Sequence, residues 1–103
     1  MTTNERKFLD YTFTKLTGSA YVEEGIFWRD RYYCKCTTLL FNIKVYLNSF
    51  KRTFGEPTLK DIEHTIFAEI ITITARIDVT NLSNVAEKYI ELIEKEDKIV
   101  CQS

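Results

Sequence analysis

Apolar residues recur at helical spacing in the first segment of the chain, residues 4–17. The residues that share one side of this helix are Leu9, Phe13 and Leu16, with Phe8 and Thr12 on the flank. Thr2 and Glu5 have the spacing of a capping box, and Gly18 stands where a left-handed cap would end the helix. The pattern predicts one helix with a single buried stripe.

The second segment, about residues 27–54, has apolar residues on two opposite sides of a helix. One stripe spans a sector of about 100° and consists of Cys36, Leu39, Leu40, Ile43, Leu47, Phe50 and Phe54. The stripe on the opposite side consists of Cys34, Thr38, Phe41 and Val45. A helix that packs on one neighbour has one apolar face, so the second stripe predicts a second partner.

The length of this helix conflicts with a small domain. A helix of about 28 residues would be about 42 Å long, whereas a compact chain of this size is about 26 Å across. Either the helix begins late and residues 21–33 form an irregular aromatic arm or a short hairpin, or the helix projects and another subunit covers it.

Two periodicities compete in the third segment, which begins at Thr58, directly after Pro57. The apolar residues that recur at helical spacing are Leu59, Ile62, Ile66, Ile70, Ile73 and Ile77. Over residues 71–79, however, apolar and polar residues alternate strictly, as they do in a half-buried strand. We favour a helix over residues 59–77, because a strand needs a partner and no other segment alternates as cleanly.

The fourth segment begins near Thr80 or Ser83 and continues to about Lys98. Its expected buried stripe is Leu82, Val85, Ala86, Tyr89, Ile90 and Ile93. Its opposite face carries carboxylates with interleaved lysines, including Glu87, Glu91 and Glu94. The favourable i, i+4 pairs are Glu91–Lys95 and Glu94–Lys98, and together they indicate a solvated outer face.

These segments predict an all-α fold, a small bundle of about four helices with one long central helix, in a single domain of residues 1–103. A strand near residues 70–80 would make the fold α+β instead. The composition agrees with one globular domain, since 45% of the residues are hydrophobic, 28% are charged, and glycine and proline are scarce.

Targeting signals are missing from the sequence as it stands. No apolar run approaches the roughly 18 residues that span a bilayer, and the N-terminal residues lack the pattern of a signal peptide. Three cysteines are an odd number and do not fit a secreted disulfide scaffold. We therefore expect a cytoplasmic, intracellular protein with reduced thiols and no membrane contact. The high content of Phe, Tyr, Ile, Asn and Lys suggests an AT-rich genome, as in a low-GC bacterium, its phage or a virus.

Few residues are suited to catalysis or to metal binding. Cys34 and Cys36 are separated by a single residue, and on a helix they lie about 200° apart, so they cannot share a zinc ion. The only histidine, His64, lies about 160° from the core stripe of its helix and is expected at the surface. The glycines form no phosphate-binding loop. We expect no enzymatic activity, no catalytic residue, no cofactor and no metal.

Charge is distributed unevenly along the chain. Residues 27–60 hold 7 basic and 2 acidic side chains, whereas residues 61–103 hold 4 basic and 9 acidic ones. We expect these two blocks to face each other, within the fold or across an oligomer. An alternative is that the basic block binds nucleic acid through Arg29, Arg31, Lys44, Lys51 and Arg52. The pI of about 5.8 argues against that alternative.

Protein–protein interaction is the favoured class of function. Aromatic residues are enriched at interface hot spots, and the candidate interaction residues are Phe41, Val45, Trp28, Tyr32 and Tyr33. We expect a protein that self-associates as a homo-oligomer and binds a further macromolecule, most simply another protein. By analogy, small proteins of AT-rich phage or bacterial genomes that lack catalytic residues are often adaptors, inhibitors or regulators.

Overall fold

The computed structural model describes residues 2–18, 27–73 and 76–95, and within the second range it describes side chains from residue 38 onward. These residues form four α-helices and two short turns of other helical types, with no strand among them. The elements are α1 (Thr3–Thr17), α2 (Phe27–Phe54), α3 (Leu59–Ile70), the 3₁₀ turn η1 (Val79–Asn81), α4 (Leu82–Tyr89) and the π-helical turn η2 (Ile90–Glu94). The predicted all-α fold is confirmed, and the strand alternative is not observed in the described part of residues 70–80.

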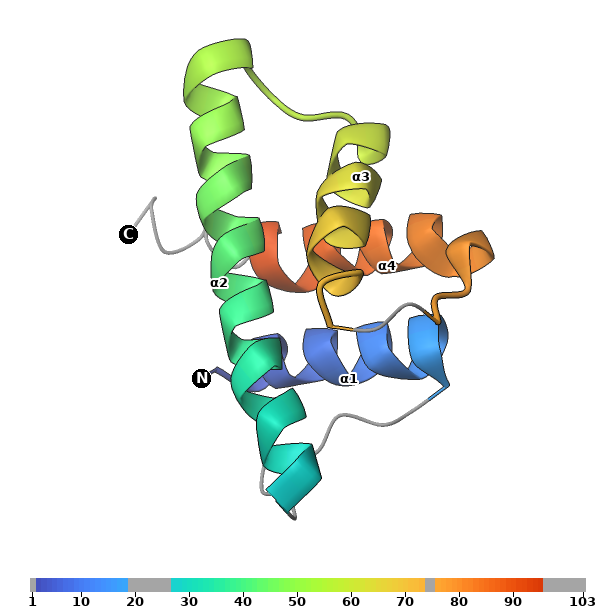
Figure 1. Ribbon diagram of the computed structural model, residues 1–103. Coiled ribbons are helices and arrows are strands. Elements are labelled where there is room, and N and C mark those ends of the chain that lie inside the picture. The colour runs from blue at the N-terminus through green and yellow to red at the C-terminus, as the bar shows by residue number, and fades with distance from the viewer. Residues whose placement is uncertain (1, 19–26, 74–75, 96–103) are drawn as a thin grey trace.

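The helices cross one another in a flat arrangement of 39 × 29 × 19 Å. Figure 1 shows α1 and α4 side by side, with α2 running across their ends as one edge of the molecule and α3 crossing α4. Helix α4 packs against both α1 and α3, and α3 also packs against α2. None of the described helices combines the length and the apolar character needed to cross a membrane.

Two helices begin at capping boxes, the first of which the sequence predicts. In α1, the Thr2 side chain accepts a hydrogen bond from the Glu5 backbone N–H, and Glu5 accepts one from the Thr2 backbone. In α3, Thr58 and Asp61 make the same reciprocal pair. Helix α1 ends at Gly18, whose φ of 76° lies in the left-handed region that glycine adopts at little cost.

One apolar core is shared by all four helices and η2. Its buried members are Phe8, Leu9, Phe13, Leu16, Leu39, Leu40, Ile43, Leu47, Ile62, Ile66, Ile70, Leu82, Val85, Ala86, Tyr89 and Ile93. The predicted stripes are largely confirmed, but two expected core positions are wrong. Phe54 is 75% exposed because the last turn of α2 extends past its neighbours, and Ile90 is exposed at the start of the π-helical turn. Of the rest of the α2 stripe, Phe50 is only half-buried, and the side chain of Cys36 lies outside the described residues.

Helix α3 ends at Ile70, so the prediction of a helix through residue 77 is wrong. Beyond Ile70 the backbone tightens: the N–H of Thr72 bonds to the Glu69 carbonyl at 3.2 Å and that of Ile73 to the Ile70 carbonyl at 2.9 Å. Residues 70–74 are all β-branched, and such side chains lose rotamer freedom in a helix. Ile73 and Ile77 still pack against the core. Their apolar character therefore reflects burial of the segment after the helix, and not a continuation of the helix.

Helix α2 begins at Phe27 and runs without a break for 28 residues. The alternative in which an irregular arm or hairpin extends to residue 33 is therefore wrong, and residues 21–26 of that arm lie outside the described residues. The helix projects beyond α1, as Figure 1 shows at its N-terminal end. A helix of this length spans the long edge of the molecule because it has no turn-forming residue before Gly55.

The fourth helix departs from α-helical geometry after Tyr89 and continues as the π-helical turn η2. The expected end near Lys98 lies outside the described residues. Glu94 was expected on the solvated face, and this prediction is wrong: the residue is 8% exposed and turns toward α2. Glu91 lies at the surface as expected, paired with Lys88 at 3.3 Å.

Candidate interaction surface

Polar contacts fix which sides of α2 are covered by the rest of the chain. On one side, the Asn42 amide donates a hydrogen bond to Glu69 of α3 at 3.2 Å. On the other side, the Lys44 ammonium lies 3.3 Å from a Glu5 carboxylate oxygen of α1. With the core stripe between them, these contacts leave one face of α2 without a neighbour in the described part of the chain.

We call this uncovered surface the outer face of α2 and define it by five exposed residues: Thr38, Phe41, Val45, Asn48 and Arg52. Phe41 is 64% exposed and Val45 is 48% exposed, one helical turn apart. The spacing of the second apolar stripe predicted that both would lie opposite the core, and they do. Polar residues flank them along the helix, so the apolar area is short and bounded.

The remaining predicted interaction residues, Trp28, Tyr32 and Tyr33, lie on the N-terminal half of α2. Arg29 and Arg31, predicted for nucleic-acid binding, lie on the same half. Their side chains fall outside the described part of the structure. The geometry of the candidate surface therefore rests on the C-terminal half of α2.

The basic residues of α2 that the structure describes have partners within the chain. Lys51 lies 2.6 Å from Glu94 of η2, and Lys44 pairs with Glu5. Arg52 is exposed and donates a hydrogen bond to the neighbouring Ser49 hydroxyl at 3.2 Å. Among the described residues, the ion pair Lys51–Glu94 joins the basic middle to the acidic C-terminal third, whereas Lys44 pairs with Glu5 of α1.

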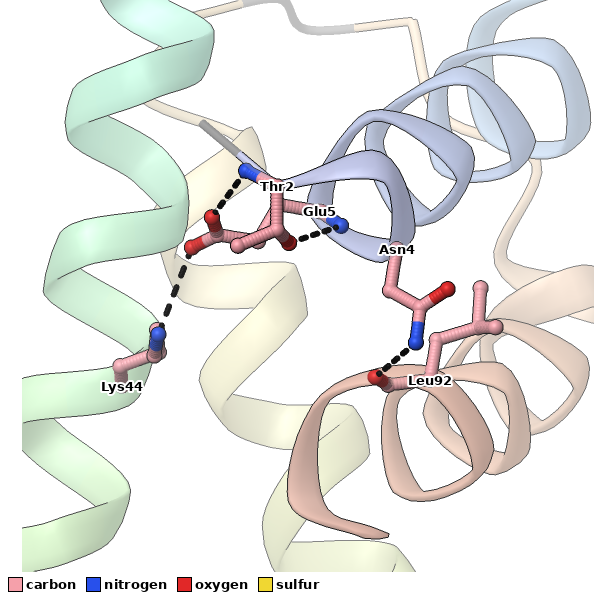
Figure 2. Close-up of polar contacts among 5 residues, drawn as sticks. All are labelled: Thr2, Asn4, Glu5, Lys44 and Leu92. Atoms are coloured by element: carbon pink, nitrogen blue, oxygen red, sulfur yellow. Dashed lines mark hydrogen bonds and ion pairs between the residues drawn. The ribbon is translucent and has the colours of Figure 1, made fainter. Parts of the chain in front are cut away.

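Glu5 joins the start of α1 to α2, as Figure 2 shows. One carboxylate oxygen accepts from the Thr2 backbone N–H at 2.8 Å, and the other faces Lys44. Burial raises the pKa of Glu5, but the Thr2 hydrogen bonds and the Lys44 charge outweigh it, so the pKa lies below its ordinary value. Beside it, the Asn4 amide donates to the Leu92 carbonyl of η2 at 3.3 Å.

Sequence reasoning missed that Glu5 and Glu94 hold α2 in place. The signal for Glu94 is its position directly after Ile93, at the border of the buried stripe. Glu5 was recognised only as a capping residue. Nothing in its spacing shows that its second oxygen faces Lys44, because that contact joins positions 39 residues apart.

A second exposed apolar area lies over α3 and was also missed. A shallow groove of about 840 Å³ runs over this helix and is lined by Tyr46 of α2 together with Phe67 and Ile71. The sequence feature that could have predicted this area is Phe67, an aromatic residue outside the Ile62–Ile66–Ile70 stripe. His64 lines the same groove and is exposed, as predicted. Within the described residues no three His, Cys, Asp or Glu side chains are grouped as metal ligands.

Comparison with known proteins gives no relative of this chain. A scan against protein-family models, a search of curated proteins and a search of solved structures each found no match.

Proposed function

We propose that this chain is a non-enzymatic, intracellular protein–protein interaction module that self-associates through the outer face of α2. In this proposal the resulting oligomer binds a further macromolecule as an adaptor, inhibitor or regulator. The observation that carries the proposal is the exposure of Phe41 and Val45 on a side of α2 that none of the other described helices covers.

Two physical arguments support association at this face. Exposed aromatic and aliphatic side chains at i, i+4 spacing present the anchors that one helix offers to another. Burying them in an interface would stabilise it by about 25 cal/mol for each Å² of apolar surface removed from water. The formal net charge of −1 also means that two copies do not repel each other strongly as they approach.

The experiment compares two valine substitutions. Val45→Glu places a charge on the outer face, and Val79→Glu places the same charge at a valine that is 55% exposed but lies on η1. We expect the mass from light scattering to fall to that of a monomer for Val45→Glu and to stay oligomeric for Val79→Glu. Circular dichroism verifies that both variants keep the wild-type helix content.

Three results would contradict the proposal. They are a wild-type protein that is monomeric at high concentration, equal loss of mass in both variants, and no loss in either. A loss of helix content in Val45→Glu alone would place Val45 in the core of the monomer and would also contradict it.

Nucleic-acid binding is the weaker alternative. Phosphate binding requires cations that are free to replace counterions, and Lys44 and Lys51 already face carboxylates of the same chain. Of the described cations on the outer face, Arg52 alone is suited to this role, which supports protein interaction over nucleic-acid binding.

A further inference from the structure

The groove over α3 is flanked by exposed apolar side chains of two helices. Tyr46 of α2 is 56% exposed, and Phe67 and Ile71 at the end of α3 are 36% and 46% exposed. Figure 1 shows α3 alongside the C-terminal half of α2, against which it packs. Phe67 and Ile71 are four residues apart, about 6 Å along a helix axis. This is one helical turn, the interval at which the apolar face of a second helix repeats its own anchors.

Carboxylates outnumber cations in the lining of this groove. Asp61, Glu63 and Glu69 line it, together with one lysine, Lys60. Asp61 accepts a hydrogen bond from a backbone N–H at the start of α3 at 2.8 Å, and Glu69 accepts one from the Asn42 amide at 3.2 Å. These donors are neutral. Within the described part of the chain, none of the three carboxylates forms an ion pair.

Glu69 lies at the end of its helix where a carboxylate is least favourable. The C-terminal turn of a helix carries partial negative charge, and the last turn of α3 contains no basic residue. A cation placed beside Glu69 would therefore interact favourably with both the carboxylate and the helix end. Other carboxylates already have such a partner, since Glu5, Glu91 and Glu94 each face a lysine of the chain. The charges of the groove thus favour a ligand that brings its own cations.

From these anchors and charges we infer that the groove over α3 binds a positively charged amphipathic helix of a partner protein. The apolar face of that helix packs on Tyr46, Phe67 and Ile71, and a lysine or arginine on its flank lies beside Glu69. Nucleic acid and anionic lipid are disfavoured, because their phosphates would face the same carboxylates. The inference rests on the proposed function in one respect, since it specifies the further macromolecule that the protein binds. It uses a surface other than the outer face of α2.

Two synthetic peptides test the inference by fluorescence anisotropy. Both are alanine-based helices with leucines at i, i+4 and i+7, and the residues that flank the leucines are lysines in one peptide and glutamates in the other. We expect the lysine peptide to bind at least about tenfold more tightly than the glutamate peptide at low salt. The difference should shrink as salt screens the charges. Equal affinity of the two peptides, or no binding of the lysine peptide at about 1 mM, would overturn the inference.

Substitutions locate the binding site. Glu69→Gln removes the charge but keeps an oxygen that can accept from Asn42, and we expect it to weaken the lysine peptide about threefold. Phe67→Ser is expected to weaken it about tenfold. The matched controls are Glu87→Gln on α4 and Phe54→Ser at the exposed end of α2, each expected to change the affinity by less than about twofold. Circular dichroism verifies the helix content of all four. Full affinity in either groove variant, or equal losses in variants and controls, would overturn the inference.

Two further measurements separate this inference from the proposed self-association. Phe41→Glu changes the outer face of α2, and we expect it to bind the lysine peptide within about threefold of wild type. Phe67→Ser is expected to keep the wild-type mass in light scattering. A monomeric Phe67→Ser beside an oligomeric wild type would show that a second copy occupies the groove, and it would overturn the inference. A monomeric wild type that still binds the lysine peptide, with the losses expected for Phe67→Ser and Glu69→Gln, would contradict self-association alone and support the inference.

Discussion

Thr12 is a polar residue in the middle of an apolar core. It lies on α1, is fully buried, and its hydroxyl has no hydrogen-bond partner among the residues that the structure describes. A buried hydroxyl without a partner costs about 1–3 kcal/mol of stability. The sequence places Thr12 on the flank of the stripe, but periodicity cannot show whether such a hydroxyl finds a partner.

Replacing Thr12 with valine is expected to stabilise the fold. Valine keeps the branched shape and removes the hydroxyl, so we expect the free energy of unfolding to rise by about 1 kcal/mol. Urea unfolding followed by circular dichroism measures the change. Thr14→Val, at an exposed position of the same helix, is the control and is expected to change stability by less than about 0.5 kcal/mol. A destabilised Thr12→Val would mean that the hydroxyl is paired.

Glu5 makes stability depend on pH. Its folded-state pKa is lowered, so the stability it contributes is fully present above the ordinary carboxyl range and is lost as the pH falls through the folded pKa. Glu5→Gln is expected to cost about 0.5–1 kcal/mol at pH 7. This difference from wild type should shrink to nothing in acid. Urea unfolding at a series of pH values measures it.

The control for Glu5 is Glu87→Gln, an exposed carboxylate in the last part of α4. It is expected to change stability by less than about 0.5 kcal/mol at pH 7. If Glu5→Gln loses the same free energy at pH 7 and in acid, the effect does not come from the ionised carboxylate.

At the scale of the elements, Lys51–Glu94 is the contact that fixes η2 against α2. The side chains are largely buried, at 27% and 11% exposure, and the charged atoms are 2.6 Å apart. Removing one partner leaves a buried charge without compensation, whereas removing both does not. The pair thus matters most when one of its members is missing.

A double-mutant cycle tests this contact. We expect Lys51→Gln and Glu94→Gln each to cost about 1–3 kcal/mol and the double variant to cost less than the sum. The exposed pair Lys88–Glu91 is the control, and its coupling is expected to be below about 0.5 kcal/mol. Equal coupling in the two cycles would show that the Lys51–Glu94 pair is solvated.

The elements themselves could be predicted from the sequence where local signals agreed. Capping at Thr2 and Thr58, the cap at Gly18 and the stripe of α1 all act within a few residues. The end of α3 could not be predicted in this way, because Ile73 and Ile77 are apolar for packing after the helix has ended. The burial of Glu94 goes with its contact to Lys51 of α2, 43 positions away, which no local pattern contains.

At the scale of the whole molecule, the two opposite stripes on α2 predicted that Phe41 and Val45 lie away from the core, and the structure places them there. Where the helices cross, and thus which side of α2 stays uncovered, follows from packing among all four helices and could not be predicted from periodicity. The partners of the basic block could not be predicted from periodicity either, because Lys44 pairs with Glu5 of α1 and Lys51 with Glu94 of η2.

Nucleic-acid binding gives a prediction at this scale. Because Lys44 and Lys51 are paired within the chain, we expect no shift of single- or double-stranded nucleic acid at about 150 mM salt. A gel-shift titration measures this. Micromolar or tighter binding that Lys51→Gln with Arg52→Gln abolishes would favour the nucleic-acid alternative.

We expect the outer face of α2 to join two copies of this chain. Sedimentation equilibrium of the wild type over a wide range of concentration tests it most directly, with Phe41→Glu as the paired variant. We expect the wild-type mass to rise from 12.2 kDa toward twice that value, whereas Phe41→Glu stays at the monomer mass with its helices intact. A wild type that remains at 12.2 kDa at every concentration would contradict it.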